Sequence, residues 1–216
     1  MMFRRFLPSQ CAVCHAWPTQ PVCAKCEDTF AHTPPAMPEP DAEADSAWDA
    51  AFAAVAYAYP WIGLIADFKF HQHPAWARYF ADLLRRNPAV VDALAAADDV
   101  IPIPLSPHRL QERGYNQALL LARALNRTKT QSQALLRVGE TAIQHTLSRS
   151  QRLQNLRNAF MVHPVYLRQA PQRRVVLVDD VMTTGASLHA AATTLRRAGV
   201  AHITVMVVAY TELVFT

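Results

Sequence analysis

Residues 175–191 read VVLVDDVMTTGASLHAA, and the fold of the chain is best inferred from this stretch. An uncharged, β-branched run leads into two adjacent acids, Asp179 and Asp180, and then into hydroxyl-bearing residues, a glycine and a helical pattern. A strand without polar alternation is typical of a parallel sheet with both faces covered. Because neighbouring carboxylates repel, we expect a ligand to account for the pair.

The turn after the acids suits a phosphate group. Backbone N–H groups at the start of a helix, beside short hydroxyls and a glycine, form a cradle for anions. The acids cannot hold that phosphate, but carboxylates accept hydrogen bonds from the vicinal hydroxyls of a sugar. We therefore predict a ribose 5-phosphate ligand, with its phosphate on Thr183 to Ser187 and its 2′ and 3′ hydroxyls on Asp179 and Asp180. An acid-rich turn before an ordinary helix is the alternative.

Strand and helix patterns alternate along most of the chain, which predicts an α/β fold with a mainly parallel sheet and helices on both faces. In such sheets ligands bind at the carboxyl ends of the strands. Strands are expected at 50–59, 99–105, 134–138, 159–163, 174–180 and 202–210. Helices are expected at 61–86, interrupted at Pro74, and at 116–128 and 186–199.

All four cysteines lie near the start of the chain, as two CxxC pairs. This spacing is typical of a tetrahedral thiolate site for a structural Zn²⁺, with the four sulfurs as ligands. Disulfides, a redox pair and an iron–sulfur cluster are the alternatives. The ligands would be Cys11, Cys14, Cys23 and Cys26.

Composition divides the chain further. Residues 32–46 are rich in proline, alanine and acid, which predicts a linker between a metal module at 1–31 and a main domain at 47–216. The net charge is +4, but residues 101–174 hold 12 arginines and lysines against Glu112 and Glu140, a local net charge of +10. A basic middle segment indicates an anionic partner, either a polyphosphate or nucleic acid, or else a solvated face.

Neither a membrane span nor a secretion signal is expected. The longest uncharged run, residues 50–66, has 17 residues and contains Pro60. A membrane helix needs about 20 apolar residues. The first residues contain two arginines without an apolar region behind them, so we expect a cytoplasmic protein.

Three stretches together resemble a known family. VVLVDDVMTTGAS looks like the phosphoribosyl pyrophosphate (PRPP) signature of type I phosphoribosyltransferases. IPIPLSPHRLQERGYNQALLLARAL (101–125) and QHTLSRSQRLQNLRNAF (144–160) resemble the arginine-rich segments of the ComF/GntX (ComFC-type) family within that superfamily. The paired CxxC motifs extend the resemblance over nearly the whole chain, apart from the linker.

The resemblance implies a type I phosphoribosyltransferase-like sheet preceded by a zinc-ribbon-like module, and a role for each motif. Mg²⁺ would accompany PRPP. The loop from Pro104 to Gln117 would bind pyrophosphate, and a hood at 139–158 would close over the site. Catalytic roles would fall to Asp179, Asp180 and Arg152. For the hood residues, a surface helix with its arginines in solvent is the alternative. The PRPP signature would comprise Asp179, Asp180, Val181, Met182, Thr183, Thr184, Gly185, Ala186 and Ser187. The pyrophosphate loop would contribute His108, Arg109, Arg113 and Gly114, and the hood Gln144, Arg149, Arg152 and Asn155.

Two functions stay open from the sequence. One is a phosphoribosyltransferase that displaces pyrophosphate from PRPP by a base or an amine, with Asp179 or Asp180 as base. The other is a competence factor for DNA uptake that senses a ligand in the same pocket and binds single-stranded DNA or partner proteins. Lys69 and His71, in DFKFHQH, are assigned either to the site or to ordinary core and surface positions.

Overall fold

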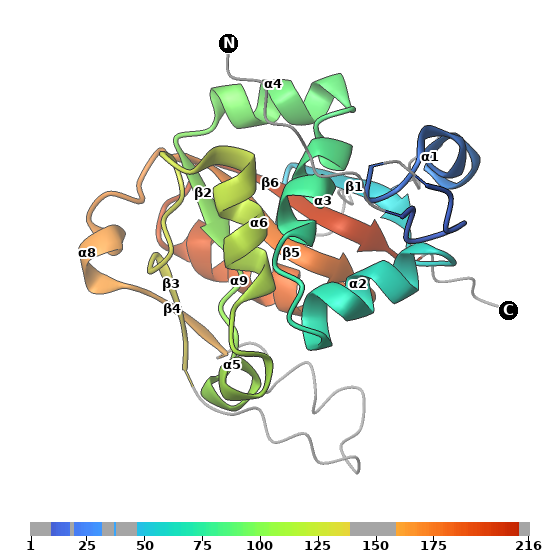
Figure 1. The fold of residues 1–216 in the computed structure, drawn as a ribbon. Coiled ribbons are helices and arrows are strands. Elements are labelled where there is room, and N and C mark those ends of the chain that lie inside the picture. The colour runs from blue at the N-terminus through green and yellow to red at the C-terminus, as the bar shows by residue number, and fades with distance from the viewer. Residues whose placement is uncertain (1–9, 18–19, 32–36, 38–46, 139–158, 212–216) are drawn as a thin grey trace, which may run out of the picture.

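Four parallel strands form the central sheet, in the order β1–β6–β5–β2. The computed structural model describes residues 10–17, 20–31, 37, 47–138 and 159–211 (Figure 1). The strands of the sheet are β1 (Ala50–Ala56), β2 (Asp99–Pro102), β5 (Arg174–Met182) and β6 (His202–Tyr210). β5 lies between β6 and β2 and is buried from Val175 to Val178, as its unbroken apolar run predicts.

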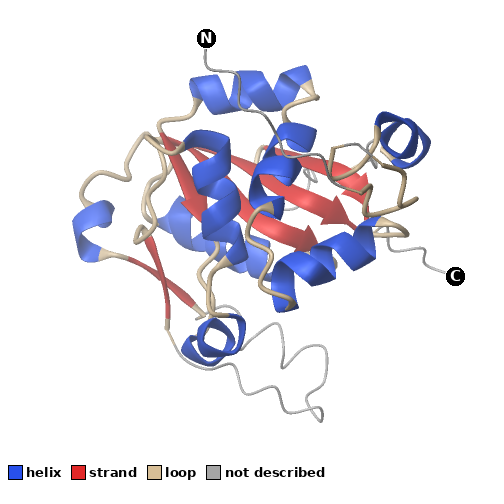
Figure 2. Ribbon diagram, viewed as in Figure 1, coloured by secondary structure: helices blue, strands red, loops and turns tan. Residues whose placement is uncertain are grey.

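Helices cover both faces of this sheet, so the predicted fold class is confirmed (Figures 1 and 2). One face packs under α2, α3, α4 and α6 around Phe68, Phe80 and Leu121. The other packs under α9 around Leu188 and Leu195. The helices on the first face are α2 (Trp61–Phe70), α3 (Trp76–Leu84), α4 (Pro88–Ala96) and α6 (Gln117–Asn126), and α9 spans Ala186–Arg197.

The sequence placed the main elements well and missed the short ones. Pro74 lies between α2 and α3, as expected. The strands expected at 134–138 and 159–163 do form, as β3 (Leu135–Arg137) and β4 (Phe160–Val162), but they pair with each other as a separate antiparallel ribbon. α1 (Ala24–Phe30), α4, α5 (Pro107–Arg113) and α8 (Pro164–Leu167) were not predicted. Three of these four helices are too short for a 3.6-residue periodicity to show.

The cysteine-bearing segment packs directly on the main domain. Glu27 of α1 is buried. It accepts hydrogen bonds from the hydroxyl of Tyr79, in α3, at 2.7 Å and from a guanidinium nitrogen of Arg86, just after α3, at 2.6 Å. Trp61, at the start of α2, donates its indole N–H to the Phe30 carbonyl at 3.0 Å. The buried Cys11, Val22 and Cys26 therefore share one core with α2 and α3.

Among the described residues, every helix is too short or too polar to cross a membrane.

Candidate functional site

The acid pair lies inside β5, near its carboxyl end. The strand was expected to stop at Asp180, but it runs on to Met182 and keeps its parallel pairing with β6. Asp180 meets Lys69 of α2, so its side chain lies on the face that α2, α3 and α6 cover. The regular alternation of the strand is interrupted at the acid pair, because Val178 and Val181 both pack against the core on that face.

Lys69 neutralises Asp180. Its Nζ lies 2.9 Å from Asp180 Oδ1, and the two side chains are only 16% and 10% exposed. Lys69 belongs to the last turn of α2. The structure thus places Lys69 beside the acid pair. His71 instead forms an exposed pair with Asp67, with His71 Nδ1 2.7 Å from Asp67 Oδ1.

Asp179 is in a different electrostatic state. Its Oδ1 accepts a hydrogen bond from the Asp180 backbone N–H at 2.8 Å. Burial and the charge of Asp180 raise the pKa of Asp179 to about 7, although that N–H, Lys69 and Arg113 act in the opposite direction. The unfolded chain loses this proton near pH 4. Ionised Asp179 therefore costs stability increasingly as the pH rises from about 4 to about 7, and a bound hydroxyl donor or cation would offset that cost.

Arginines approach the acids from two further elements. Arg113 ends α5, donates to Gln117 Oε1 at 3.2 Å and lies 5.0 Å above the centroid of the Phe70 ring. Arg137, on β3, was not predicted by the sequence. Burial and the charge of Arg109 lower its pKa, and the charge of Asp179 acts in the opposite direction. Many short strands end in a basic residue, so nothing in the sequence distinguished Arg137 from the other arginines.

The segment expected as a pyrophosphate loop is mostly helical, which corrects its expected conformation, while its role in binding pyrophosphate stays a prediction. Pro107–Arg113 form α5, capped by the Ser106 hydroxyl, because proline and a preceding serine favour a helix start. Gly114 ends the helix with a φ of +76°, and a Cβ added there would meet no atom within 4 Å. A glycine is therefore favoured at this position by the backbone conformation and not by the close approach of a neighbour. Asn116 caps α6 by accepting from the Leu119 N–H at 3.2 Å. From α5, the charge of Arg113 still lowers the pKa of Asp179, and the charge of Arg109 lowers the pKa of Arg137.

The predicted phosphate cradle forms a turn between β5 and α9. Thr183 and Thr184 are exposed, and Thr184 Oγ1 accepts from the Ala186 N–H at 3.4 Å. Gly185 has a φ of +70°, and a Cβ there would lie 2.8 Å from the Met182 Cε. Only glycine adopts this left-handed conformation without strain. The turn thus presents hydroxyls and the N-terminus of a 12-residue helix beside the acid pair.

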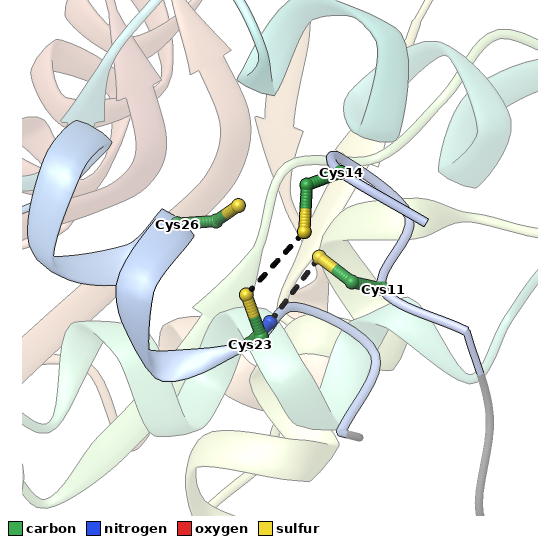
Figure 3. Close-up of side chains that lie close together, drawn as sticks. All are labelled: Cys11, Cys14, Cys23 and Cys26. Atoms are coloured by element: carbon green, nitrogen blue, oxygen red, sulfur yellow. Dashed lines mark hydrogen bonds between the residues drawn. The ribbon is translucent and has the colours of Figure 1, made fainter. Parts of the chain in front are cut away.

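The four cysteines form a second site, apart from the sheet edge (Figure 3). Their sulfurs all lie within 4.8 Å of one another, and Cys14 and Cys23 are 3.6 Å apart. Four sulfurs about 3.8 Å apart surround a tetrahedral ion at a bond length near 2.3 Å. All four cysteines are free thiols, and the structure therefore does not contain the disulfides that were considered as an alternative. The arrangement is compatible with a metal ion.

The electrostatics of the four thiols also favour a cation. Burial raises the pKa of Cys11, but the backbone N–H groups of Cys14 and Cys23 outweigh it and lower that pKa to about 6. Burial and the neighbouring thiol groups raise the pKa of Cys26 to about 12. A second thiolate beside the first is costly, and a bound cation would remove that cost.

Part of the predicted site lies outside the described residues. The hood at 139–158 belongs to that part, with Gln144, Arg149, Arg152 and Asn155. The described residues that flank it are adjacent, because the Val138 N–H donates to the Ala159 carbonyl at 2.9 Å. The catalytic role expected for Arg152 stays a prediction.

Comparisons with known proteins agree with this geometry. The family model for the phosphoribosyl transferase domain matches residues 122–212, which include the acid pair and the turn after it. Competence protein F of Haemophilus influenzae is 39% identical over 168 residues, covering 74% of this chain and 72% of that protein. The DNA utilization protein YhgH of Escherichia coli O6:H1 is 35% identical over 169 residues, covering 73% and 70%.

The fold and the site thus define a phosphoribosyltransferase-like domain. The chain belongs to the ComF family of the type I phosphoribosyltransferase superfamily. Among solved structures, an allosteric regulatory enzyme of purine biosynthesis has a TM-score of 0.38 and 21% identity, over 66% of this chain and 29% of that one. A likeness at that level carries no argument.

The turn at Gly185 is directly testable. We expect Gly185→Ala to lower the free energy of unfolding by about 1–2 kcal/mol, because alanine is strained at positive φ and its methyl group displaces the Met182 side chain. Gly63 is the matched control, since it is helical and has open space around it. Gly63→Ala should raise stability by up to about 1 kcal/mol. Urea unfolding of both variants measures the difference, and equal shifts would contradict the assignment.

Proposed function

We propose that the protein binds PRPP or another ribose 5-phosphate, together with Mg²⁺, at the carboxyl end of β5. The observation that carries the proposal is the junction of Asp179 and Asp180 with the Gly185 turn at the start of α9. Carboxylates that can accept hydrogen bonds from hydroxyl groups lie there beside a turn suited to an anion, and a sugar phosphate would use both. The match to a phosphoribosyl transferase domain over 122–212 supports the same ligand class.

Each part of the ligand has a matching part of the site. The 5-phosphate would lie on the turn from Thr183 to Ser187, and the ribose hydroxyls would donate to the acid pair. The pyrophosphate would face the arginines of α5 and β3, whose planar guanidinium groups suit phosphate oxygens. Mg²⁺ would accompany the pyrophosphate and help to neutralise it, with Asp179 and Asp180 as the nearest carboxylates of the chain.

A transfer reaction at this site would break the bond between the anomeric carbon and pyrophosphate and form one to a nitrogen of a base or amine. Positive charge from Arg109, Arg113 and Arg137 would stabilise the leaving group. The partly protonated state of Asp179 suits a group that accepts a proton from the acceptor near neutral pH. We propose this chemistry as the use of the site, with Asp179 as the base.

Calorimetry with PRPP and Mg²⁺ tests the ligand. We expect saturable binding by the wild type, and binding weakened about 10–100-fold by Asp179→Asn with Asp180→Asn, because two hydrogen bonds to charged acceptors are removed. Asp92→Asn, on the exposed side of α4, removes a charge far from the site and should leave binding unchanged. Absence of binding by the wild type would refute the pocket, and absence of pyrophosphate release with a panel of bases and amines would refute the transfer.

The names of the relatives favour a second use of the protein, in competence and DNA utilization. We propose it as the alternative, with single-stranded DNA or competence proteins as partners and the pocket as a ligand sensor. The basic segment supports it only in part. Lys129 donates to three carbonyls at the end of α4, and Arg173 pairs with Asp99 at 3.5 Å. These two charges serve the fold itself.

Salt dependence tests direct DNA binding. If the site arginines bind the strand, Arg109→Ala with Arg113→Ala should lower the slope of log affinity against log salt by about 0.7 for each arginine that no longer neutralises a phosphate. Arg197→Ala, at the opposite end of α9 from the turn, is the control and should leave the slope unchanged. A slope that is flat in the wild type would exclude direct binding of phosphates.

We propose a structural Zn²⁺ on Cys11, Cys14, Cys23 and Cys26, within a metal module at 1–31 that the linker 32–46 joins to the main domain. Reduced, metal-bound thiols suit a cytoplasmic location. We expect one zinc per chain in purified protein, and we expect its removal by a chelator to lower the melting temperature, because α1 and the α2–α3 side share a core. Metal analysis and thermal unfolding measure both. Metal-free protein with unchanged melting would contradict the site.

A further inference from the structure

Lys69 is held from both of its ends. At the side-chain end, Nζ forms the ion pair with Asp180 at 2.9 Å. At the backbone end, the Lys69 carbonyl accepts from Gln117 Nε2 at 3.2 Å, and Gln117 is only 1% exposed. A lysine on a surface loses about 2 kcal/mol of rotamer entropy when it is fixed in one place. Here the surrounding structure restricts it before any ligand binds.

The neighbours of Lys69 on α2 are fixed by the same part of the chain. The Phe68 carbonyl accepts from the Tyr115 hydroxyl at 2.5 Å, and the Phe70 ring lies under the guanidinium of Arg113. Tyr115 and Arg113 flank Gly114, between α5 and α6. Three successive residues of α2 are thus tied to the connection that carries the site arginines. The position of Lys69 relative to β5 follows from these contacts.

The acid that Lys69 meets needs such a partner. Asp180 is 7% exposed and sits next to Asp179 in the strand. A buried carboxylate without a nearby cation takes up a proton, and a protonated carboxyl donates as well as accepts. The ion pair with Lys69 fixes one of the two oxygens of Asp180. The other oxygen then has a defined direction.

We propose that Lys69 is a positioning residue that sets the sugar specificity of the site, because it holds Asp180 as a fixed acceptor for a ribose hydroxyl. The inference rests on the proposed ribose 5-phosphate function and deepens it. A site built to accept a hydrogen bond from a hydroxyl rejects the analogue that lacks that hydroxyl, because a buried acceptor is left without a partner. The structure therefore assigns the preference for ribose over 2-deoxyribose to the pair of Lys69 and Asp180.

Three ligands separate positioning from direct binding. Calorimetry with Mg²⁺ is carried out on the full chain with ribose 5-phosphate, 2-deoxyribose 5-phosphate and inorganic pyrophosphate. We expect the wild type to prefer ribose 5-phosphate over its deoxy analogue by at least about 100-fold. Lys69→Met should reduce that ratio to about threefold or less and leave pyrophosphate affinity within about threefold of the wild type. Lys69→Arg, which keeps the charge, should retain most of the ratio.

Lys129→Met is the matched control for loss of an anchored lysine. Lys129 is fixed by the carbonyls of Leu94, Ala95 and Ala97, away from the acid pair, so its loss should lower the melting temperature and leave the sugar ratio unchanged. If Lys69→Met does not fold, Gln117→Leu replaces it, because this change removes the backbone anchor of Lys69 and should also lower the ratio.

The outcomes separate the two proposals. A wild type that binds neither sugar phosphate overturns the ribose phosphate function and this inference with it. A wild type that binds ribose 5-phosphate, while Lys69→Met or its replacement keeps the full ratio, overturns the role of Lys69 alone. Loss of pyrophosphate affinity in Lys69→Met, in step with both sugars, would show that Lys69 binds the anion directly and would also overturn the positioning role.

Discussion

The ion pair between Lys69 and Asp180 joins the two halves of the site. β5 carries Asp180, and α2 carries Lys69 across the face of the sheet. Without a cation at this point, two adjacent acids inside a covered strand would repel each other and exclude the charged form of both. With it, Asp180 is neutralised by Lys69. Burial and the charge of Asp180 raise the pKa of Asp179 to about 7, so Asp179 keeps its proton to a higher pH than an ordinary aspartate.

The remaining charges follow from the same arrangement. Arg113 approaches from α5 and Arg137 from β3, so that cations come from separate elements around a pair of acids. Sites of this kind bind ligands that are themselves mixed in character, with anionic groups for the arginines and hydroxyls for the carboxylates. A phosphorylated ribose has both. In the proposed function, the Gly185 turn would add a neutral cradle of N–H groups and hydroxyls for the phosphate.

Much of this could be read from the sequence, because the relevant patterns are local. The uncharged run before Asp179 predicted a covered strand, the glycine and hydroxyls after Asp180 predicted a turn into a helix, and the cysteine spacing predicted a four-sulfur site whose atoms the structure does bring together. The helix α5 was missed, because its seven residues are too few to show a period and the prolines at 102, 104 and 107 suggested a loop. Lys69 was left undecided, because nothing in DFKFHQH shows which way a side chain near the end of a helix points.

The class of the fold, the acid pair with its turn, and the four cysteines were already specified by the sequence, because strand, turn and knuckle each depend on residues that are neighbours along the chain. Which cation meets which acid depends instead on the packing of distant elements. Lys69, Arg113 and Arg137 lie on α2, α5 and β3, and they come together only when the helices and the β3–β4 ribbon pack around the sheet. The difference between Asp179 and Asp180 was likewise settled by packing, because Lys69 pairs with Asp180, whereas burial and the charge of Asp180 raise the pKa of Asp179.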